Sequence, residues 1–520
     1  PPPATAPAVR AGYSEAPLEP SHACRPVAGL ISCLMNLQLD RRSFLKSTAA
    51  FAAFGLLPLG TLAAEATTLN CCSRKKKPAR LRGAFFYPPA EVVLAGRNED
   101  SWSRHEWFTW PGNQFQPERQ QAKFLARLRE ITAGLDLALA LEEKPLYTDA
   151  AIRQFINSLA DDRPDALLLF NFWNSFSAKL RPILDAWNGP IILYHPVGAN
   201  HQLPPEYFRT APRLQYIHSI ENWESLERGL RAVHAMTRLG QSRLLRVSGR
   251  TQTESDAVEP GFGLPIHTVP ADHFNQVYDD TVVTREMERL ARLVRRRARR
   301  VTDLADPAFR DAVRAHLAVQ EIMNRHQADA ITIECLFLKH RKPCLSFALN
   351  NGNLVPCGCE NDLNATLTLM LGAYCFGRGG FQHNPEFDTE QNLYFASHCT
   401  CTTRLHGPRA KEATYDLRPF FHQMPKTLAL DVQWPAGETV TLCKYQSGKN
   451  RLDAWQGRVV SSPACPPTGG CATRVLVKLE DVKDVCSVYP GPHPILYCGS
   501  WAGHLKTLAQ LYGLEIKTNV

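Results

Sequence analysis

The chain has 520 residues, of which 44% are hydrophobic and 21% charged, a composition typical of a globular protein with several domains. Its net charge of +9 comes partly from two basic runs, residues 71–82 and 292–300. Neither run belongs to a known nucleic-acid-binding motif or alternates with aromatic residues, so the charge does not indicate a nucleic-acid partner. In the segment that contains the second run, the apolar residues Met287, Leu290 and Val294 recur at helical spacing. We therefore expect it to be the solvated face of a helix.

The first 66 residues do not resemble part of a folded domain. Residues 1–34 are rich in Pro and Ala without periodicity, which predicts a disordered or non-native extension. Residues 35–66 begin with Met35, and their RRSFLK motif precedes a short apolar run rich in Ala and Gly, as in a twin-arginine signal peptide. That run is too short and too rich in small residues for a stable membrane span. We expect the twin-arginine translocase to export the folded chain to the periplasm or an equivalent compartment.

From residue 79 the chain alternates predicted strands with amphipathic helices, which indicates an α/β fold with doubly wound parallel sheets. We expect a first Rossmann-like domain over residues 79–212 and a second over 213–350. After residue 350 the pattern changes to period-two segments, typical of antiparallel strands, so residues 351–520 are predicted to form a β-rich C-terminal domain. The predicted strands of this last domain are 426–434, 438–445, 454–462 and 473–482, after a helix over 363–374.

Three common enzyme motifs are missing from the sequence. No predicted strand leads into a G-x-G-x-x-G turn and a helix, which disfavours a nicotinamide-dependent oxidoreductase. Neither a G-x-S-x-G elbow nor a Walker loop is present.

Residues that could bind a metal stand instead at the ends of predicted elements. Glu334 lies in an apolar strand, where an ionised carboxylate is costly unless it is paired or bound to a cation. Glu360 and Asp362 precede the helix 363–374, whose positive end favours their ionised form, although Asp362 could simply be an N-cap. His398 ends a predicted strand, and His493 stands between turn residues and a strand.

This oxygen and nitrogen donor set suits Mn²⁺, with Co²⁺, Ni²⁺ and Mg²⁺ as alternatives. A metal with open positions could bind a hydroxyl–carbonyl pair, while a carboxylate moves a proton between adjacent carbons through an enediol. Such chemistry is aldose–ketose isomerisation.

The cysteines offer a different interpretation. Twelve of the 16 cysteines lie at or after Cys335, and the pairs Cys357/Cys359 and Cys399/Cys401 could form a zinc or redox site. However, C-x-C pairs lack the usual zinc-ligand spacing, so buried thiols are the favoured interpretation. Only one pair, Cys465 and Cys471, suggests a local disulfide.

The stretch from Ala328 to Pro408, which contains PCGCENDLNATL, resembles the L-fucose/L-arabinose isomerase superfamily, and L-fucose isomerase-related proteins most closely. The segment GPHPILYCGSWAGHLKTLAQLYGLEI resembles the closing segment of that family. The resemblance implies a fucose isomerase-like fold, with two Rossmann-like domains and a β-rich third, and a trimer or hexamer in which a neighbouring subunit closes the site. It also implies a Mn²⁺ enzyme that isomerises a free monosaccharide.

Carried onto this chain, the resemblance makes Glu334 a metal ligand and base, and Glu360 the second acidic ligand, with Asp362 as its rival. It makes His493 the C-terminal histidine ligand and His398 an additional one. Many relatives have Gly-Asp where this chain has Gly499 and Ser500, so the acidic residue is absent here.

Two further points remain open. The aromatic stretch 102–110 would suit stacking on a sugar, or packing at a subunit interface. The alternative to an isomerase is a non-catalytic exported protein that binds carbohydrate on the same fold.

Overall fold

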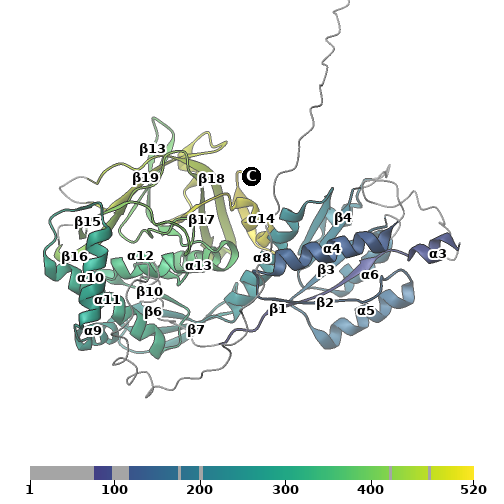
Figure 1. Cartoon of the computed structure of the whole chain (residues 1–520), viewed down its shortest axis with the longest axis horizontal. Helices are drawn as coiled ribbons and strands as arrows, with labels where there is room; N and C mark the ends of the chain where they lie inside the picture. The colour runs from purple at the N-terminus through teal and green to yellow at the C-terminus, as the bar shows by residue number, and fades with distance from the viewer. Residues whose placement is uncertain (1–74, 96–115, 174–176, 198–202, 421–423, 466–469) are drawn as a thin grey trace, which may run out of the picture. The chain divides into compact units, whose positions relative to one another are not determined.

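The chain folds into a mixed α/β protein with two mainly parallel sheets and a β-rich C-terminal part (Figure 1). The predicted extension 1–34, the predicted signal 35–66 and the aromatic stretch 102–110 all lie outside the described residues. No helix within the described ranges is long and apolar enough to cross a bilayer. The computed structural model describes residues 75–95, 116–173, 177–197, 203–420, 424–465 and 470–520.

The first sheet is parallel throughout, with the strand order β2-β1-β3-β4-β5. All six residues of β3 (ALLLFN) are buried, as expected for a central strand covered on both faces. Helices surround these strands (Figure 1). Phe124 of α4 packs against Trp223 of α8 with 4.7 Å between ring centroids. The elements are β1 (Ala79–Phe86), α3 (Ala90–Leu94), α4 (Pro117–Thr132), β2 (Leu137–Leu141), α5 (Asp149–Asp162), β3 (Ala166–Asn171), α6 (Ser177–Ala186), β4 (Ile191–Pro196), α7 (Glu206–Thr210), β5 (Leu214–Ser219) and α8 (Trp223–Gly240).

The second sheet has the order β11-β10-β6-β8-β7, and only β7 runs antiparallel to its neighbour. Helix α11 supplies much of its cover, with Ala315, Val319 and Met323 buried in the core beside β10. The elements are β6 (Leu244–Ser248), β7 (Ser255–Glu259), β8 (Leu264–Pro270), α9 (Ala271–Asp280), α10 (Arg285–Arg297), α11 (Asp306–Arg325), β10 (Ala330–Ile333), the 3₁₀ turn η4 (Cys335–Leu338), α12 (Cys344–Gly352) and β11 (Cys357–Cys359).

Two strands, β5 (Leu214–Ser219) and β11 (Cys357–Cys359), lie in a different sheet from the one predicted from the sequence. Strand β5, expected to open the second α/β domain, pairs with β4 as the edge of the first sheet. Strand β11, expected in the β-rich part, pairs in parallel with β10 in the second sheet. The change from the first sheet to the second therefore falls between Ser219 and Leu244, not at residue 212.

The C-terminal part is β-rich, as expected. An eight-stranded, largely antiparallel sheet has the order β12-β20-β17-β18-β19-β14-β13, with β21 beside β18, and a smaller sheet has the order β16-β15-β9. Strand β9 (Arg300–Val301) comes from an earlier part of the chain and joins the smaller sheet. The elements after residue 360 are α13 (Leu363–Leu371), the π turn η5 (Gly372–Phe376), β12 (Phe381–Gln382), β13 (Asn384–Asp388), β14 (Leu393–His398), β15 (Tyr415–Phe420), β16 (Met424–Val432), β17 (Thr439–Gln446), β18 (Arg451–Ser461), β19 (Thr473–Leu479), β20 (Ile495–Cys498), α14 (Ala502–Tyr512) and β21 (Glu515–Thr518).

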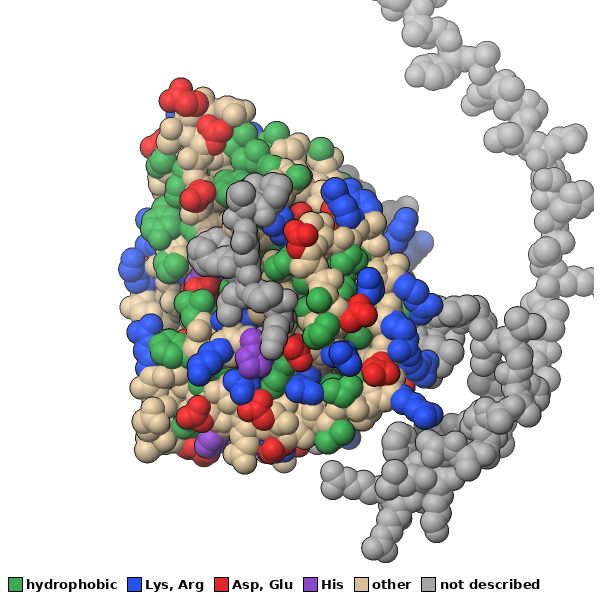
Figure 2. Space-filling model, turned by 90° about the vertical axis from the view of Figure 1, so that its left-hand side faces the viewer, with side chains coloured by type: hydrophobic (Ala, Val, Ile, Leu, Met, Phe, Trp, Pro, Cys, Tyr) green, Lys and Arg blue, Asp and Glu red, His purple; other side chains and the backbone are tan. Residues whose placement is uncertain are grey.

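The basic run is a solvated helix face, as expected, only as far as Arg297, where α10 ends. Arg299 follows the helix, Arg300 belongs to β9, and both pair with Asp416 of β15. Met287, Ala291 and Val294 are buried on one side, while the arginines at the end of the helix are exposed. Arg292 pairs with Glu288, four residues earlier on the helix, at 3.8 Å. On the face of the molecule shown in Figure 2, Lys and Arg side chains are scattered among acidic and apolar ones.

The predicted bridge between Cys465 and Cys471 is wrong. The described residues show no disulfide between the two, and the Cys465 sulfur lies 3.2 Å from the backbone oxygen of Cys471. The Cys471 thiol instead hydrogen-bonds to the thiol of Cys399.

Gly358, in the middle of β11, allows α13 to pack closely on the strand. A Cβ atom at this position would lie 2.0 Å from Oγ1 of Thr366 in α13. We expect Gly358→Ala to lower the free energy of unfolding by about 1–3 kcal/mol, because the helix must shift to make room. Gly448→Ala is the control, since its Cβ would meet no atom within 4 Å. Equal urea midpoints for the two variants would contradict this close packing.

Candidate functional site

The register of two parallel strands places two acidic residues side by side. Ile333 of β10 pairs with Cys359 of β11, and each is the last residue of its strand, so Glu334 and Glu360 directly follow the ends of neighbouring strands. Both acids therefore stand at the carboxyl edge of the second sheet, where open α/β sheets bind their ligands.

The buried carboxylate of Glu334 has several partners, as expected for an acid in an apolar environment. Its Oε2 accepts hydrogen bonds from the Gly249 amide at 2.9 Å and from the Ser248 hydroxyl at 3.3 Å. Its Oε1 pairs with Nε of Arg250 at 2.7 Å, although the Arg250 side chain is 78% exposed. The carboxylate is thus held by fixed donors on one oxygen and by a solvent-exposed arginine on the other.

A tight turn after β11 directs the Glu360 side chain. Glu360 and Asn361 both have left-handed backbones, with φ of 58° and 59°. Residues other than glycine adopt this conformation at a cost of about 1 kcal/mol or more each, and such strain is concentrated at functional sites. The Asn361 amide group accepts from Arg246 at 2.7 Å and lies 3.5 Å from Oε2 of Glu334. Asn361 therefore links the two acidic positions.

Glu360 lies between two histidines. Its Oε1 is 3.5 Å from Nε2 of His398, at the end of β14, and its Oε2 is 3.5 Å from Nε2 of His493, before β20. The two imidazole rings are perpendicular, with centroids 5.7 Å apart. Both histidines are buried, whereas the Glu360 side chain is 31% exposed. Three segments that are distant in sequence thus bring one carboxylate and two imidazoles together.

The two histidines strongly affect the ionisation of this group. Hydrogen bonds to His398 and then to His493 lower the pKa of Glu360 well below its usual range, despite partial burial. Burial alone would lower the pKa of His493, but its bonds to Asp362 and Glu360 outweigh that effect and raise it to about 9. Without a cation, the group is therefore an ion pair at neutral pH.

Asp362 contacts the ring nitrogen of His493 that does not face Glu360. Its carboxylate caps α13 by accepting from the Ala365 amide at 2.8 Å, as the N-cap interpretation predicts. Its Oδ2 also lies 3.1 Å from Nδ1 of His493. Because a carboxylate only accepts, Nδ1 of His493 donates in this contact, and Nε2 is directed at Glu360.

Lys444 of β17 connects Asp362 to the segment that carries His493. Its Nζ lies 3.1 Å from Oδ2 of Asp362 and also donates to the Pro492 carbonyl. Burial lowers the pKa of Lys444, and Asp362 partly offsets that effect. Burial would raise the pKa of Asp362, but His493 and Lys444 outweigh it and lower the pKa.

A cavity of about 870 Å³ opens between the carboxyl edge of the second sheet and strands β13 and β14. Glu360 and His398 form part of its wall. The wall also carries polar and charged groups, including Lys339, Glu386 and Arg474, beside several thiols. Glu360 and His398 are therefore accessible to a small polar molecule, whereas His493 is not part of the cavity wall.

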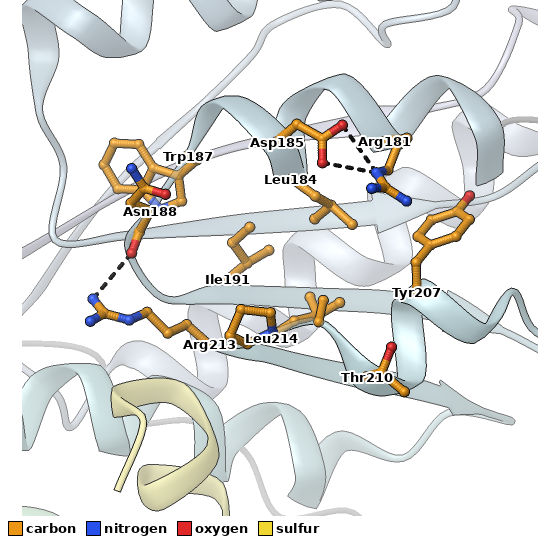
Figure 3. A pocket seen from close by; sticks show the side chains of 12 residues that line it. Arg181, Leu184, Asp185, Trp187, Asn188, Ile191, Tyr207, Thr210, Arg213 and Leu214 are labelled. Atoms are coloured by element: carbon orange, nitrogen blue, oxygen red, sulfur yellow. Dashed lines mark hydrogen bonds and ion pairs between the residues drawn. The ribbon is translucent and has the colours of Figure 1, made fainter.

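Another hollow, of about 620 Å³, lies at the amino ends of β4 and β5 (Figure 3). Its charged groups are engaged locally: Arg181 pairs with Asp185 on α6 at 2.8 Å, and Arg213 donates to the Asn188 carbonyl at 3.1 Å. It lies at the opposite edge of a parallel sheet from that where ligands normally bind. The cavity beside Glu360 is the better candidate.

The structure thus brings four of the five predicted residues into one group: Glu360, Asp362, His398 and His493. Glu334 lies beside this group through Asn361, but its own partners are Ser248, Gly249 and Arg250.

Sequence reasoning missed several supporting residues. Lys444 stands between Cys443 and Tyr445, so alternation along the strand predicts a solvent-facing lysine, whereas the structure buries both faces of β17. Arg250 and Asn361 likewise carried no signal.

No protein-family model matches the chain, and a comparison with curated proteins finds no match.

Proposed function

We propose that the chain is a metal-dependent aldose–ketose isomerase, or an isomerase-like enzyme, that acts on a free monosaccharide. The observation that carries this proposal is the position of the Glu360 carboxylate between Nε2 of His398 and Nε2 of His493, 3.5 Å from each. The sequence resemblance to the L-fucose/L-arabinose isomerase superfamily implies a metal held by these three residues and by Glu334.

The donor set fits a divalent cation of the Mn²⁺ class. Glu360, His398 and His493 would hold it, with Co²⁺, Ni²⁺ and Mg²⁺ as alternatives. Donors that share an octahedral ion at about 2.1 Å lie about 3 Å apart. The two 3.5 Å separations join different oxygens of Glu360, so both histidines must move toward one another, as well as toward Glu360, to share one ion. Such a cation would polarise the carbonyl group of an open-chain sugar.

The protein's own groups would supply the proton transfer. Glu334 directly follows β10, and Glu360 directly follows the neighbouring strand β11. A carboxylate at Glu334 can take a proton from the carbon beside the carbonyl and return it to the neighbouring carbon, through an enediol. The exposed Arg250 can leave Oε1 without any change in the core, while Gly249 and Ser248 keep Oε2 in place. Asp362 would orient His493 rather than bind the metal.

The cavity supports a sugar as the substrate. Its volume of about 870 Å³ exceeds that of a monosaccharide, and charged side chains in its wall can bond to hydroxyl groups. We also propose that the twin-arginine pathway exports the chain, on the basis of its RRSFLK motif. The family resemblance further implies that the chain assembles into trimers or hexamers.

The deciding experiment combines metal analysis of the purified chain with a panel of aldoses and ketoses, followed by NMR in D₂O. We expect a bound divalent cation, and solvent deuterium at C1 or C2 of at least one sugar. If a sugar binds but no member of a broad panel exchanges, the chain is instead a non-catalytic carbohydrate-binding protein.

Replacing Asp362 with asparagine should separate orientation of His493 from helix capping. Asparagine is as good an N-cap as aspartate, so the free energy of unfolding should change little through the cap. The charge that holds His493 is lost, and we expect the affinity for Mn²⁺ to fall about 10–100-fold. Isothermal titration calorimetry measures this change.

Asn222→Ala is the matched control, because it removes the cap of α8, where Asn222 accepts from Ser225 at 3.0 Å. This variant should lose stability and keep its affinity for Mn²⁺. Unchanged Mn²⁺ affinity in the Asp362→Asn variant would contradict the orienting role.

A further inference from the structure

Cysteine thiols from separate elements meet in the wall of the cavity. Five cysteines line it, and none of them forms a disulfide: Cys335, Cys344, Cys359, Cys399 and Cys471. Only one cysteine of each C-x-C pair is among them, so the paired motifs do not act as units. The thiols that meet come instead from η4 and β11, and from segments next to β14 and β19.

The closest contact is between Cys335 and Cys359, whose sulfurs lie 3.3 Å apart. Both side chains are buried, with 1% and 2% exposure. Two thiolates that bind one zinc ion at about 2.3 Å in tetrahedral geometry lie roughly 3.8 Å apart. A shift of about half an ångström would therefore let both sulfurs bind a single ion.

A nitrogen donor stands beside this pair. The ligand atoms of Cys359, Glu360 and His398 all lie within 4.8 Å of one another. Thiolate and imidazole donors together suit thiophilic or borderline cations, whereas oxygen donors suit Mg²⁺ and Mn²⁺. Lys342, which also lines the cavity and donates to the Cys335 carbonyl at 2.6 Å, would help to balance the charge of two thiolates.

We propose that Cys335 and Cys359 form a binding site for a thiophilic divalent cation of the Zn²⁺ and Cd²⁺ class, with His398, which lies beside Cys359, as a further donor. The site shares His398 with the donor group around Glu360, so the two kinds of cation compete for one imidazole. It goes beyond the proposed isomerase, because cation binding is measured without a sugar and can succeed or fail independently of exchange activity.

The test is a Cd²⁺ titration of the reduced, metal-free chain, followed through the ultraviolet thiolate-to-cadmium charge-transfer band. Cys71 and Cys72 are adjacent in the sequence and could bind Cd²⁺ themselves, so the titration uses a chain in which both are replaced by serine. We expect one tightly bound Cd²⁺ per chain.

Cys335→Ala and Cys359→Ala should each weaken this binding by at least the roughly hundredfold that loss of a supporting residue can cost at a metal site. Cys375→Ala is the matched control, since Cys375 is fully buried and does not line the cavity. It should bind Cd²⁺ as the parent chain does.

A second measurement does not depend on the variants folding. Bound Cd²⁺ should protect Cys335 and Cys359 of the otherwise unmodified chain from alkylation, as read by peptide mass spectrometry. Equal alkylation with and without Cd²⁺ would overturn the proposal. So would loss of the band on replacing Cys399 or Cys471 but not Cys335, because the other thiol pair would then hold the ion.

Discussion

Replacing Glu360 with glutamine is expected to lower the affinity for Mn²⁺ about a thousandfold, equivalent to roughly 4 kcal/mol, and to abolish deuterium exchange into sugars. Glu360 is the only carboxylate of the described residues that faces both His398 and His493, 3.5 Å from each. The amide keeps the size of the side chain but removes the charge that a divalent cation requires. Calorimetric titration with Mn²⁺ measures the loss.

Glu386→Gln is the matched control, because Glu386 also lines the cavity but stands on β13, exposed and away from the histidines. This variant should bind Mn²⁺ as the unaltered chain does. If both variants bind equally well, Glu360 is not a ligand, and the metal proposal loses its central residue.

Replacing Glu334 with glutamine should produce a different result. We expect deuterium exchange at C1 or C2 to fall by about 10²–10⁴-fold, the usual contribution of a general base, while affinity for Mn²⁺ changes only a few-fold. Glu334 does not contact the histidines, and glutamine can still accept from the Gly249 amide, so the local structure should persist. NMR in D₂O and a Mn²⁺ titration separate these two effects.

Arg250→Ala provides the control for Glu334. It removes the ion pair to Oε1 but leaves the carboxylate and its bonds to Ser248 and Gly249. Exchange should persist in this variant. Full exchange activity in Glu334→Gln would rule Glu334 out as the proton-transfer group.

Much of the local structure followed from periodicity and from the cost of burial. The burial of α10 on its Met287 side follows from helical spacing. The need for partners at Glu334 follows from the desolvation of a carboxylate, and the structure supplies them. Such properties depend on neighbouring residues in the chain, which is why the sequence predicts them.

Features that depend on hydrogen bonding between strands distant in the chain were harder to predict from the sequence. No local signal shows that β5 completes the first sheet or that β11 joins β10, because hydrogen bonding to a distant strand decides sheet membership. The sequence also left Glu360 and Asp362 as rival ligands. The structure separates their positions, because Asp362 lies behind His493 while Glu360 faces both imidazoles.

The register of β10 with β11 has a consequence for how this protein can vary. Because backbone pairing of Ile333 with Cys359 sets the spacing of Glu334 and Glu360, the length of the chain between the two strands does not set it. Insertions and deletions in the intervening turns, for instance between η4 and α12, should therefore be tolerated without moving either acid. A single-residue deletion inside β11 would instead shift Glu360 and invert its side chain, and we expect evolution to exclude it.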